Sequence, residues 1–416
     1  MINAREIAAL RDAMRAVHAE GEVPALVTLL QVDGSAYRRP GAKMLVRPDG
    51  ATTCMISGGC LEPELAEVAR EVLASGKPRR VRYDLSEEEV WGLGLGCGGA
   101  IDLYIEPLHR QSVPAQWVEL QAAGAPAVLA SMFTKNGATH RLFRGPAPAG
   151  NGGNSGSGEP LSAEPMNDRV AARAAQLLEA GSSASKLESV DGHEVFFDLS
   201  TSVPELVLFG GGPGAVPLAA RAVEIGFRVI VVDPRTSVAN TASFPDAEIV
   251  AAHPEQYPEL VPVSPHSHVV IMNHHLERDR EALVYAIEHT PAYIGVLGPR
   301  RRFEKLLDAL EAEGRKPDED AVHRVHNPVG LDIGAEGPEE IALSILAEIL
   351  AEQRGHSGTR LMDKGSGIHE RSHGHAHVAG SHTHDGVHKH GHGGAQSYAD
   401  AHGGAAQGRS AAAAQN

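Results

Sequence analysis

Cys60 is the residue of this sequence whose setting most clearly favours chemistry. It follows Ser-Gly-Gly (57–59) and precedes LEPELAEVAREVL, a segment with apolar residues at helical spacing. The positive end of a helix dipole stabilises a thiolate relative to a thiol. Gly58 and Gly59 leave the sulfur uncovered and could offer backbone N–H groups to an anion. We therefore expect Cys60 to be a functional thiol, and the alternative is a small apolar residue that fills a core.

Cys97 lies in a second glycine-rich segment, LGLGCGGA (93–100), again without bulky neighbours. Two thiols in open loops of one small domain could face the same cleft, so we expect Cys97 to be the partner of Cys60. Cys54, within TTCMI, is expected to be a buried strand residue. Three cysteines without a C-x-x-C pair favour neither a disulfide framework nor a structural zinc site.

A glycine turn indicates a second site. The apolar run ELVLF (205–209) is followed by GGGPGA (210–215), in which Gly210, Gly212 and Ala215 fit the pattern G-x-G-x-x-G/A. Gly210 permits a tight turn, and Gly212, with Gly214 beside it, lets a pyrophosphate approach the backbone. The free N–H groups of the helix that follows favour an anion.

Asp233 closes the next strand, 18 residues after Ala215. An acidic residue at this distance suits a ribose diol and disfavours a 2′-phosphate, although Arg235 weakens that exclusion. The context of strand, turn, helix and acid predicts a nucleotide-like ligand. The alternative is a domain of Rossmann shape that binds no ligand.

The elements around these residues predict an α/β protein with two structured parts. Residues 1–108 are expected to form a small α/β domain that carries the cysteines. Residues 204–355 alternate strand and helix patterns, which predicts a Rossmann-like, doubly wound parallel sheet. Residues 109–203 are a connecting region, with a flexible linker at 145–160 by composition.

The C-terminal 61 residues, 356–416, contain eleven of the 23 histidines and few apolar residues, so we expect a disordered His-rich tail. Close imidazoles bind divalent ions such as nickel or zinc, and the alternative is a polar tail that binds metal only incidentally. The candidate ligands are His373, His375, His377, His382, His384, His388, His390 and His392.

The net charge of -16 argues against a nucleic-acid-binding surface. The N-terminal segment is charged and helical in pattern, without the apolar core of a secretory signal. No apolar stretch approaches the ~20 residues that span a membrane. We therefore expect a cytoplasmic protein without membrane or nucleic-acid partners.

Seven segments of the chain, in this order, form a recognisable set: GSAYRRPGAKMLV (34–46), SGGCLE (57–62), GLGCGG (94–99), FGGGPGA (209–215), VVIMNHHLERD (269–279), YIGVLGPRRR (293–302) and HNPVGLDIGAEGPEEIALSILAEI (326–349). They cover most of residues 10–108 and 204–350. Together they resemble the XdhC/CoxI family, the accessory proteins that mature molybdenum hydroxylases such as xanthine dehydrogenase.

The resemblance implies a chaperone rather than an enzyme. Such a protein binds molybdenum cofactor, as molybdopterin or its dinucleotide form, while a cysteine desulfurase supplies the terminal sulfur. It then passes the cofactor to the molybdenum hydroxylase apoenzyme. Soft thiols suit molybdenum or transferable sulfur, and a glycine cradle suits the phosphate end.

Three further residues are candidates for cofactor contact. Arg38 and Arg39 could pair with the phosphate or the pterin edge, and the alternative is a solvated basic loop. His274 follows a predicted strand near the expected crevice, as a ligand contact or only a turn residue.

Two other functions are considered. An NAD-dependent oxidoreductase would explain residues 205–235 but would leave the cysteine-bearing domain without a role. A metal-storage or metal-delivery factor would act through the His-rich tail. A homodimer is considered as the assembly.

Overall fold

The computed structural model describes residues 4–34, 36–84, 99–135, 137–145, 168–181 and 184–363. Its first sheet is antiparallel, in the order β3-β2-β1-β5-β4. The central strand, β1, begins with six consecutive buried residues, five of which are apolar. The strands are β1 (Ala25–Asp33), β2 (Lys43–Val46), β3 (Thr52–Thr53), β4 (Arg79–Asp84) and β5 (Ala100–Pro107).

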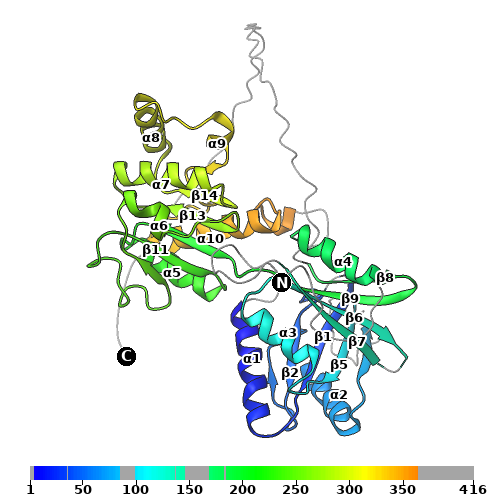
Figure 1. The fold of residues 1–416 in the computed structure, drawn as a ribbon. Coiled ribbons are helices and arrows are strands. Elements are labelled where there is room, and N and C mark those ends of the chain that lie inside the picture. Colours follow the sequence, from blue (N-terminus) through cyan, green and yellow to red (C-terminus); the bar gives the residue numbers. More distant parts are fainter. Residues whose placement is uncertain are drawn as a thin grey trace, which may run out of the picture. The chain divides into compact units, whose positions relative to one another are not determined.

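Helices cover both faces of this sheet (Figure 1). α2 (Glu62–Ser75) packs Leu65 and Val72 onto one face. On the other face, α1 (Ala4–Ala19) and α3 (Val113–Ala122) share an apolar cluster with Leu26 and Leu45. The helix expected directly after Cys60 is therefore present, and it is anchored by an amphipathic stripe.

Residues 127–200 contribute a second antiparallel sheet, in the order β7-β6-β9-β8, with α4 (Asp168–Glu179) packed on it. β6 pairs with both β7 and β9, and the hairpin of β8 and β9 was not anticipated from the sequence. Asp191 and Gly192, which join β8 to β9, both have positive φ, as an Asp-Gly hairpin turn requires. The strands are β6 (Ala127–Thr134), β7 (Gly137–Arg144), β8 (Lys186–Val190) and β9 (His193–Ser200).

A buried ion pair joins the two antiparallel sheets. Lys43 Nζ of β2 lies 2.5 Å from Asp198 Oδ2 of β9, and their side chains are 1% and 3% exposed. The carboxylate also accepts hydrogen bonds from Trp117 Nε1 at 2.6 Å and Ser185 Oγ at 2.8 Å. We expected a domain boundary after residue 108. The two antiparallel sheets on either side of it share this buried network of Lys43, Asp198, Trp117 and Ser185.

The C-terminal sheet is parallel, in the order β12-β11-β10-β13-β14-β15, and this confirms the predicted Rossmann-like fold. The strand order reverses beside β10, so the carboxyl ends of β10 and β13 flank the crevice where doubly wound sheets bind ligands. The strands are β10 (Glu205–Phe209), β11 (Arg228–Val232), β12 (Glu248–Val250), β13 (Ser267–Ile271), β14 (Tyr293–Val296) and β15 (Val325–His326).

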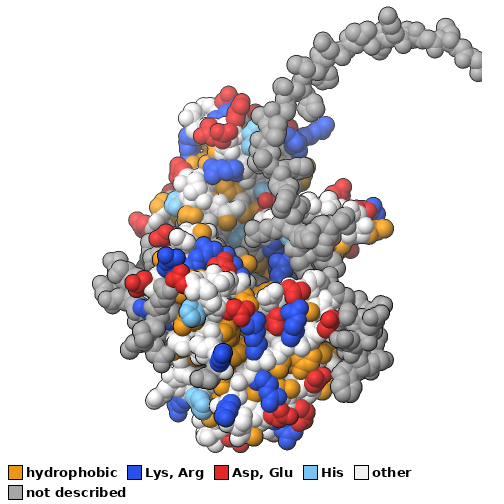
Figure 2. Space-filling view, turned by 90° about the vertical axis from the view of Figure 1, so that its right-hand side faces the viewer, with side chains coloured by type: hydrophobic (Ala, Val, Ile, Leu, Met, Phe, Trp, Pro, Cys, Tyr) orange, Lys and Arg blue, Asp and Glu red, His pale blue; other side chains and the backbone are white. Residues whose placement is uncertain are grey.

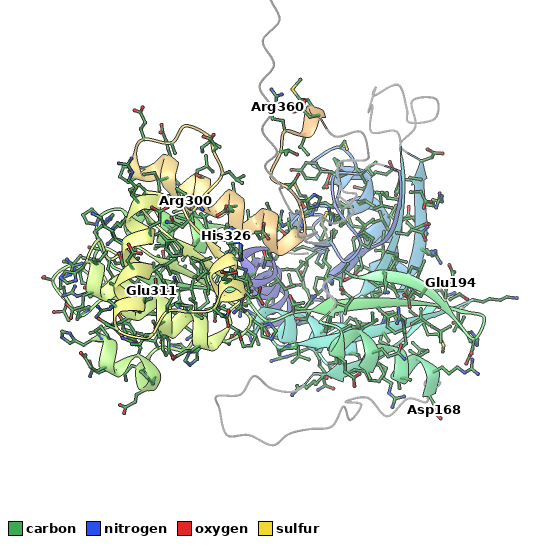
Figure 3. All side chains as sticks on the ribbon, turned by 90° about the horizontal axis from the view of Figure 1, so that it is seen from above. Asp168, Glu194, Arg300, Glu311, His326 and Arg360 are labelled. Atoms are coloured by element: carbon green, nitrogen blue, oxygen red, sulfur yellow. The ribbon has the colours of Figure 1, made fainter. Side chains whose placement is uncertain are left out.

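Alternate residues of β10 face two different apolar clusters. α5 (Ala215–Glu224) and α10 (Pro338–Arg354) pack on one face, and α6 (Tyr257–Leu260), α7 (Leu276–His289) and α8 (Arg300–Ala312) pack on the other (Figure 1). Figure 3 labels Arg300 and Glu311 near the two ends of α8. The short elements are η1 (Pro254–Gln256), α9 (Glu319–His323) and η2 (Leu361–Asp363).

Surface charges of both signs are mixed on the face shown in Figure 2. Ion pairs between surface side chains include Arg80 with Glu194 at 2.8 Å and Arg82 with Asp33 at 2.7 Å. Within the described residues, no helix combines the length and apolar character needed to cross a bilayer. The tail was expected to be disordered from residue 356, but residues 356–363 are described and include η2. The rest of the tail, from residue 364 onward, lies outside the described residues, so its expected disorder remains a prediction.

Candidate functional site

The loop before α2 is organised by one carboxylate. Glu62 accepts hydrogen bonds from the backbone N–H groups of Ile56 at 2.8 Å, Ser57 at 2.7 Å and Gly59 at 2.8 Å. We expected the Gly59 N–H to be available to a bound anion, but it donates to the carboxylate of Glu62 instead. Helix α2 begins with Glu62 itself, so the carboxylate also lies at the positive end of the helix dipole.

Cys60 lies directly before this helix start, as predicted. Its side chain is half-buried at the edge of the apolar cluster under α2, and its Sγ lies 3.6 Å from the carbonyl oxygen of Ser57. Tyr37 is a neighbour of the same loop that the sequence did not indicate. A Cβ added to Gly58 would lie 3.4 Å from the Tyr37 ring, which is 63% exposed. The loop of Cys60 is therefore bordered by an exposed aromatic ring.

Arg38 fastens the neighbouring loop to α1. Its guanidinium forms two hydrogen bonds with the Glu6 carboxylate, at 2.8 Å and 2.6 Å, and its side chain is 19% exposed. A phosphate would therefore have to displace Glu6 to bind Arg38. Arg39, the next residue, is exposed.

Cys54 is not a strand residue, which corrects the sequence interpretation. β3 ends at Thr53, and Cys54 has a φ of 65° in the turn that follows. Its thiol donates to the carbonyl oxygen of Glu6 at 3.4 Å, and burial raises its pKa to about 11. Cys97 lies outside the described residues, so its pairing with Cys60 remains a prediction.

The three glycines of the turn after β10 differ in their surroundings. Gly210 has a φ of 113°, and an added Cβ would lie 2.7 Å from the backbone of Asn273. A Cβ on Gly211 would lie 2.8 Å from Ala239 Cβ, whereas a Cβ on Gly212 would meet no atom within 4 Å. Gly210 and Gly211 are thus required for packing, while Gly212 leaves space open to a ligand.

The helix that follows the turn has no side-chain cap. α5 begins at Ala215 with Gly214 as its N-cap residue, which provides no side-chain cap. The N–H groups of Ala215 and Val216 donate to the carbonyl oxygens of Gly212 at 2.8 Å and Pro213 at 3.4 Å, and Pro217 has no N–H. What α5 offers an anion in front of Gly212 is therefore the positive end of its dipole rather than free first-turn N–H groups. The anion site itself remains a prediction.

Asp233 is fully buried, and its carboxylate is occupied by protein donors. Oδ2 accepts from the Gly211 N–H at 2.9 Å and from Arg235 Nη2 at 2.7 Å, and Oδ1 accepts from Arg235 N and Nε, both at 2.9 Å. Burial alone would raise the pKa of Asp233, but these hydrogen bonds lower it below its usual value. Recognition of a ribose diol by Asp233, as predicted, would require Arg235 to be displaced.

Asn273 and His274 follow β13 on the other side of the crevice. Asn273 is 6% exposed, and its N–H and Nδ2 both donate to Asp279 Oδ1 at 3.0 Å. Its Oδ1 has no hydrogen-bond partner among the described residues. A buried acceptor without a donor indicates a bound ligand or water. His274 is exposed with a φ of 57°, a conformation typical of a turn.

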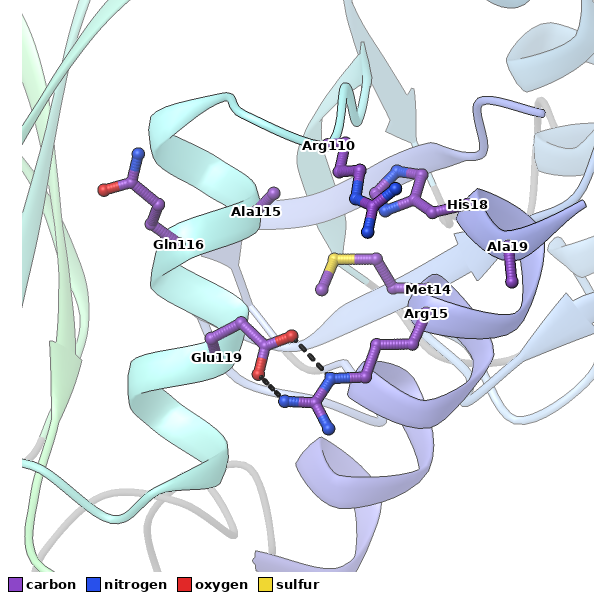
Figure 4. A pocket seen from close by; sticks show the side chains of 8 residues that line it. All are labelled: Met14, Arg15, His18, Ala19, Arg110, Ala115, Gln116 and Glu119. Carbon is purple, nitrogen blue, oxygen red and sulfur yellow. Dashed lines mark hydrogen bonds and ion pairs between the residues drawn. The ribbon is translucent and has the colours of Figure 1, made fainter. Parts of the chain in front are cut away.

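A separate cavity of about 410 Å³ lies between α1 and α3 (Figure 4). Arg15 bridges the helices through Glu119, with hydrogen bonds at 2.8 Å and 2.5 Å, and His18 Nε2 lies 2.8 Å from the Leu108 carbonyl oxygen. None of the predicted site residues is among those that line it. The lining residues are Met14, Arg15, His18, Ala19, Arg110, Ala115, Gln116 and Glu119.

Within the described part of the chain, no group of three or more His, Cys, Asp or Glu side chains is arranged to hold a metal ion. The eight tail histidines predicted to bind nickel or zinc, His373 to His392, lie outside that part.

Two family models match the chain. Residues 17–84, which include Cys60, match the model of the XdhC and CoxI family. Residues 206–349, which include the glycine turn, match the model of the XdhC Rossmann domain. The two matches thus include Cys60 and the glycine turn, whereas Cys97 lies outside both.

Individual proteins are similar over most of their length. A probable xanthine dehydrogenase subunit from Bacillus subtilis is 31% identical over 80% of this chain and 94% of its own. The molybdenum cofactor insertion chaperone PaoD of Escherichia coli is 26% identical over 82% of this chain and 86% of its own. The crystal structure of a protein named xanthine dehydrogenase from Bacillus halodurans has 28% identity and a TM-score of 0.66, over 85% of this chain and 98% of that one. The protein described here therefore belongs to the XdhC and CoxI family.

Proposed function

We propose that this protein binds molybdenum cofactor, keeps it bound while its terminal sulfur is added, and delivers it to a molybdenum hydroxylase such as xanthine dehydrogenase. The similarity to a molybdenum cofactor insertion chaperone and to a probable xanthine dehydrogenase subunit supports this role. The cofactor is cargo in this account, and the protein is a carrier rather than an enzyme.

The observation that carries the proposal is the space in front of Gly212. Molybdopterin ends in a phosphate, and its dinucleotide form contains a pyrophosphate. Either group fits a turn in which a Cβ at residue 212 would meet no protein atom within 4 Å and which lies at the positive end of the α5 dipole. The unpartnered Asn273 Oδ1, beside Gly210, offers an acceptor to an N–H or O–H group of the same ligand.

The N-terminal part would contribute the soft donor. Cys60 is held at a defined position by the hydrogen bonds of Glu62, so its sulfur does not need to be ordered when cargo arrives. Sulfur is a ligand type that molybdenum and labile sulfide accept readily. We assign Cys60 to the contact with the metal or with the sulfur that is transferred, and Cys97 as its partner.

Reconstitution of an apo-hydroxylase tests the proposal. Purified xanthine dehydrogenase apoenzyme, molybdenum cofactor, a cysteine desulfurase and cysteine are combined with and without this protein. We expect the protein to increase the yield of cyanide-sensitive, sulfurated hydroxylase at least several-fold, and Gly212→Val to abolish most of the increase. An equal yield without the protein would contradict the proposed function.

A further inference from the structure

The end of β11 differs from the usual dinucleotide site in one respect. An acidic residue at this position ordinarily accepts hydrogen bonds from a ribose diol, which requires free carboxylate oxygens. Each oxygen of Asp233 already accepts two hydrogen bonds, from the N–H of Gly211 and from three donors of Arg235. A carboxylate has about four acceptor positions, so none is left for a diol.

Arg235 is the outer group of this pair. Its Nε and Nη2 donate to the two oxygens of Asp233, which fixes the plane of the guanidinium, and its side chain is 43% exposed. Nη1 makes no hydrogen bond within the described residues, so it can donate to a ligand. A guanidinium held in one orientation suits phosphate oxygens, because little side-chain entropy is lost on binding.

The guanidinium also lies beside the glycine turn. Arg235 Nη2 and the Gly211 N–H donate to the same oxygen, Asp233 Oδ2. The next residue, Gly212, borders open space, and the uncapped start of α5 follows. A ligand in front of Gly212 therefore meets the outer N–H groups of an oriented guanidinium, whose charge is balanced by Asp233, on the side where a ribose diol would otherwise lie.

We infer that Arg235, held by Asp233, makes the Rossmann crevice selective for a ligand whose phosphate group lies between the turn at Gly212 and the end of β11, in place of a ribose diol. The inference rests on the proposed function, because it concerns the same phosphate-bearing ligand. The shared chemistry is a phosphate monoester, which both molybdopterin and the 2′-phosphate of NADPH provide.

Two variants and two kinds of probe test the inference. Arg235→Gln removes the charge and releases Asp233, and Arg235→Lys restores the charge without the bidentate geometry. Arg228→Gln is the matched control, since Arg228 begins the same strand at its opposite end. The probes are molybdopterin, followed by its pterin fluorescence after oxidation, and the pair NADH and NADPH, followed by fluorescence titration.

We expect Arg235→Gln to weaken molybdopterin binding at least 10-fold, Arg235→Lys to recover part of it, and Arg228→Gln to change it less than 2-fold. We also expect the wild type to bind NADPH at least 10-fold more tightly than NADH, and Arg235→Gln to remove this preference. Equal molybdopterin affinity in Arg235→Gln and Arg228→Gln would overturn the inference, as would equal wild-type affinity for NADH and NADPH. Suppose that Arg235→Gln and Arg228→Gln bind molybdopterin equally well but Gly212→Val does not bind it. The proposed function would then stand, and only the role of Arg235 would fail.

Discussion

The Glu62 carboxylate binds two groups of Ser57: it accepts one hydrogen bond from the Ser57 N–H at 2.7 Å and another from the Ser57 hydroxyl at 2.5 Å. Ser57 Oγ in turn accepts from the Leu61 N–H at 2.8 Å. These contacts close the loop that contains Cys60 and attach it to the first turn of α2. The position of the thiol therefore depends on one ionised carboxylate.

Replacing Glu62 by glutamine should destabilise this loop. The amide nitrogen of glutamine is a donor, so it cannot accept the hydrogen bonds that one oxygen of the Glu62 carboxylate accepts from the loop. We therefore expect Glu62→Gln to lower the free energy of unfolding by about 1–3 kcal/mol. Glu67→Gln, an exposed substitution on the same helix, should change it by less than about 0.5 kcal/mol. Urea unfolding at pH 7 measures both, and equal values for the two variants would contradict this role of Glu62.

The same carboxylate predicts a pH dependence. Burial would raise the pKa of Glu62, but hydrogen bonds from Ser57 and Ile56 lower it below its usual value. A carboxyl whose pKa is lowered on folding stabilises the fold above its unfolded pKa of about 4.3, and this contribution is lost as the pH falls through the folded pKa. The stability difference between wild type and Glu62→Gln should therefore be constant from pH 6 to 8 and shrink below about pH 4. An undiminished difference at pH 3 would show that ionisation of Glu62 is not the cause.

The two described cysteines should differ in reactivity and in function. Because the pKa of Cys54 is about 11, only about one thiol in a thousand is ionised at pH 8. We expect iodoacetamide to label Cys60 much faster than Cys54, as measured by peptide mass spectrometry. Cys60→Ser should reduce the yield of sulfurated hydroxylase several-fold with little change in Tm, whereas Cys54→Ser should leave the yield near wild type. Full activation by Cys60→Ser would show that this thiol only packs.

The sequence predicted the fold class, the turn at 210–215 and the helix after Cys60, because each depends on local pattern: apolar periodicity, glycine spacing and a helix start. It did not predict which polar groups are already satisfied. The partners of Arg38 and Asp233 are Glu6 and Arg235. Glu6 is 32 residues from Arg38, and no periodicity reports such a tertiary contact.

The hairpin of β8 and β9 was missed for a different reason. The Asp-Gly pair at 191–192 is a strong hairpin signal, but β8 is short and only partly buried, so its apolar pattern is weak. The buried pair of Lys43 and Asp198 could not be inferred at all, because the two residues are 155 positions apart. Tertiary contacts of this kind decide which sheets pack together.

This buried pair should be essential for the packing of the two antiparallel sheets. Lys43→Met leaves the charge of Asp198 buried without its partner, and we expect a loss of about 3–5 kcal/mol in the free energy of unfolding. The double variant Lys43→Met, Asp198→Asn removes both charges and should recover part of that loss. Arg80→Ala, which breaks the more exposed pair with Glu194, should cost less than about 1 kcal/mol. If Lys43→Met and Arg80→Ala lowered the free energy of unfolding by similar amounts, the buried pair would not be essential for the packing of the two sheets.

Adjacent glycines of the turn should respond in opposite ways. Gly211→Ala places a Cβ about 2.8 Å from Ala239 Cβ, so we expect a loss of about 1–3 kcal/mol in stability from overpacking. Gly212→Val meets no atom within 4 Å of its Cβ, so it should leave Tm nearly unchanged and block the ligand instead. Thermal unfolding of both variants checks this contrast, which would be absent if Gly212 were also required for packing.

The most direct test of the account is the amount of molybdenum cofactor that the purified protein retains. The wild type is incubated with released cofactor under anaerobic conditions and passed through a desalting column, and molybdenum and pterin are then measured per chain. We predict about one of each per wild-type chain and less than about one tenth of that for Gly212→Val, with both proteins equally folded by Tm. Retention by the wild type no greater than that of the variant would contradict the claim that this crevice holds the cofactor.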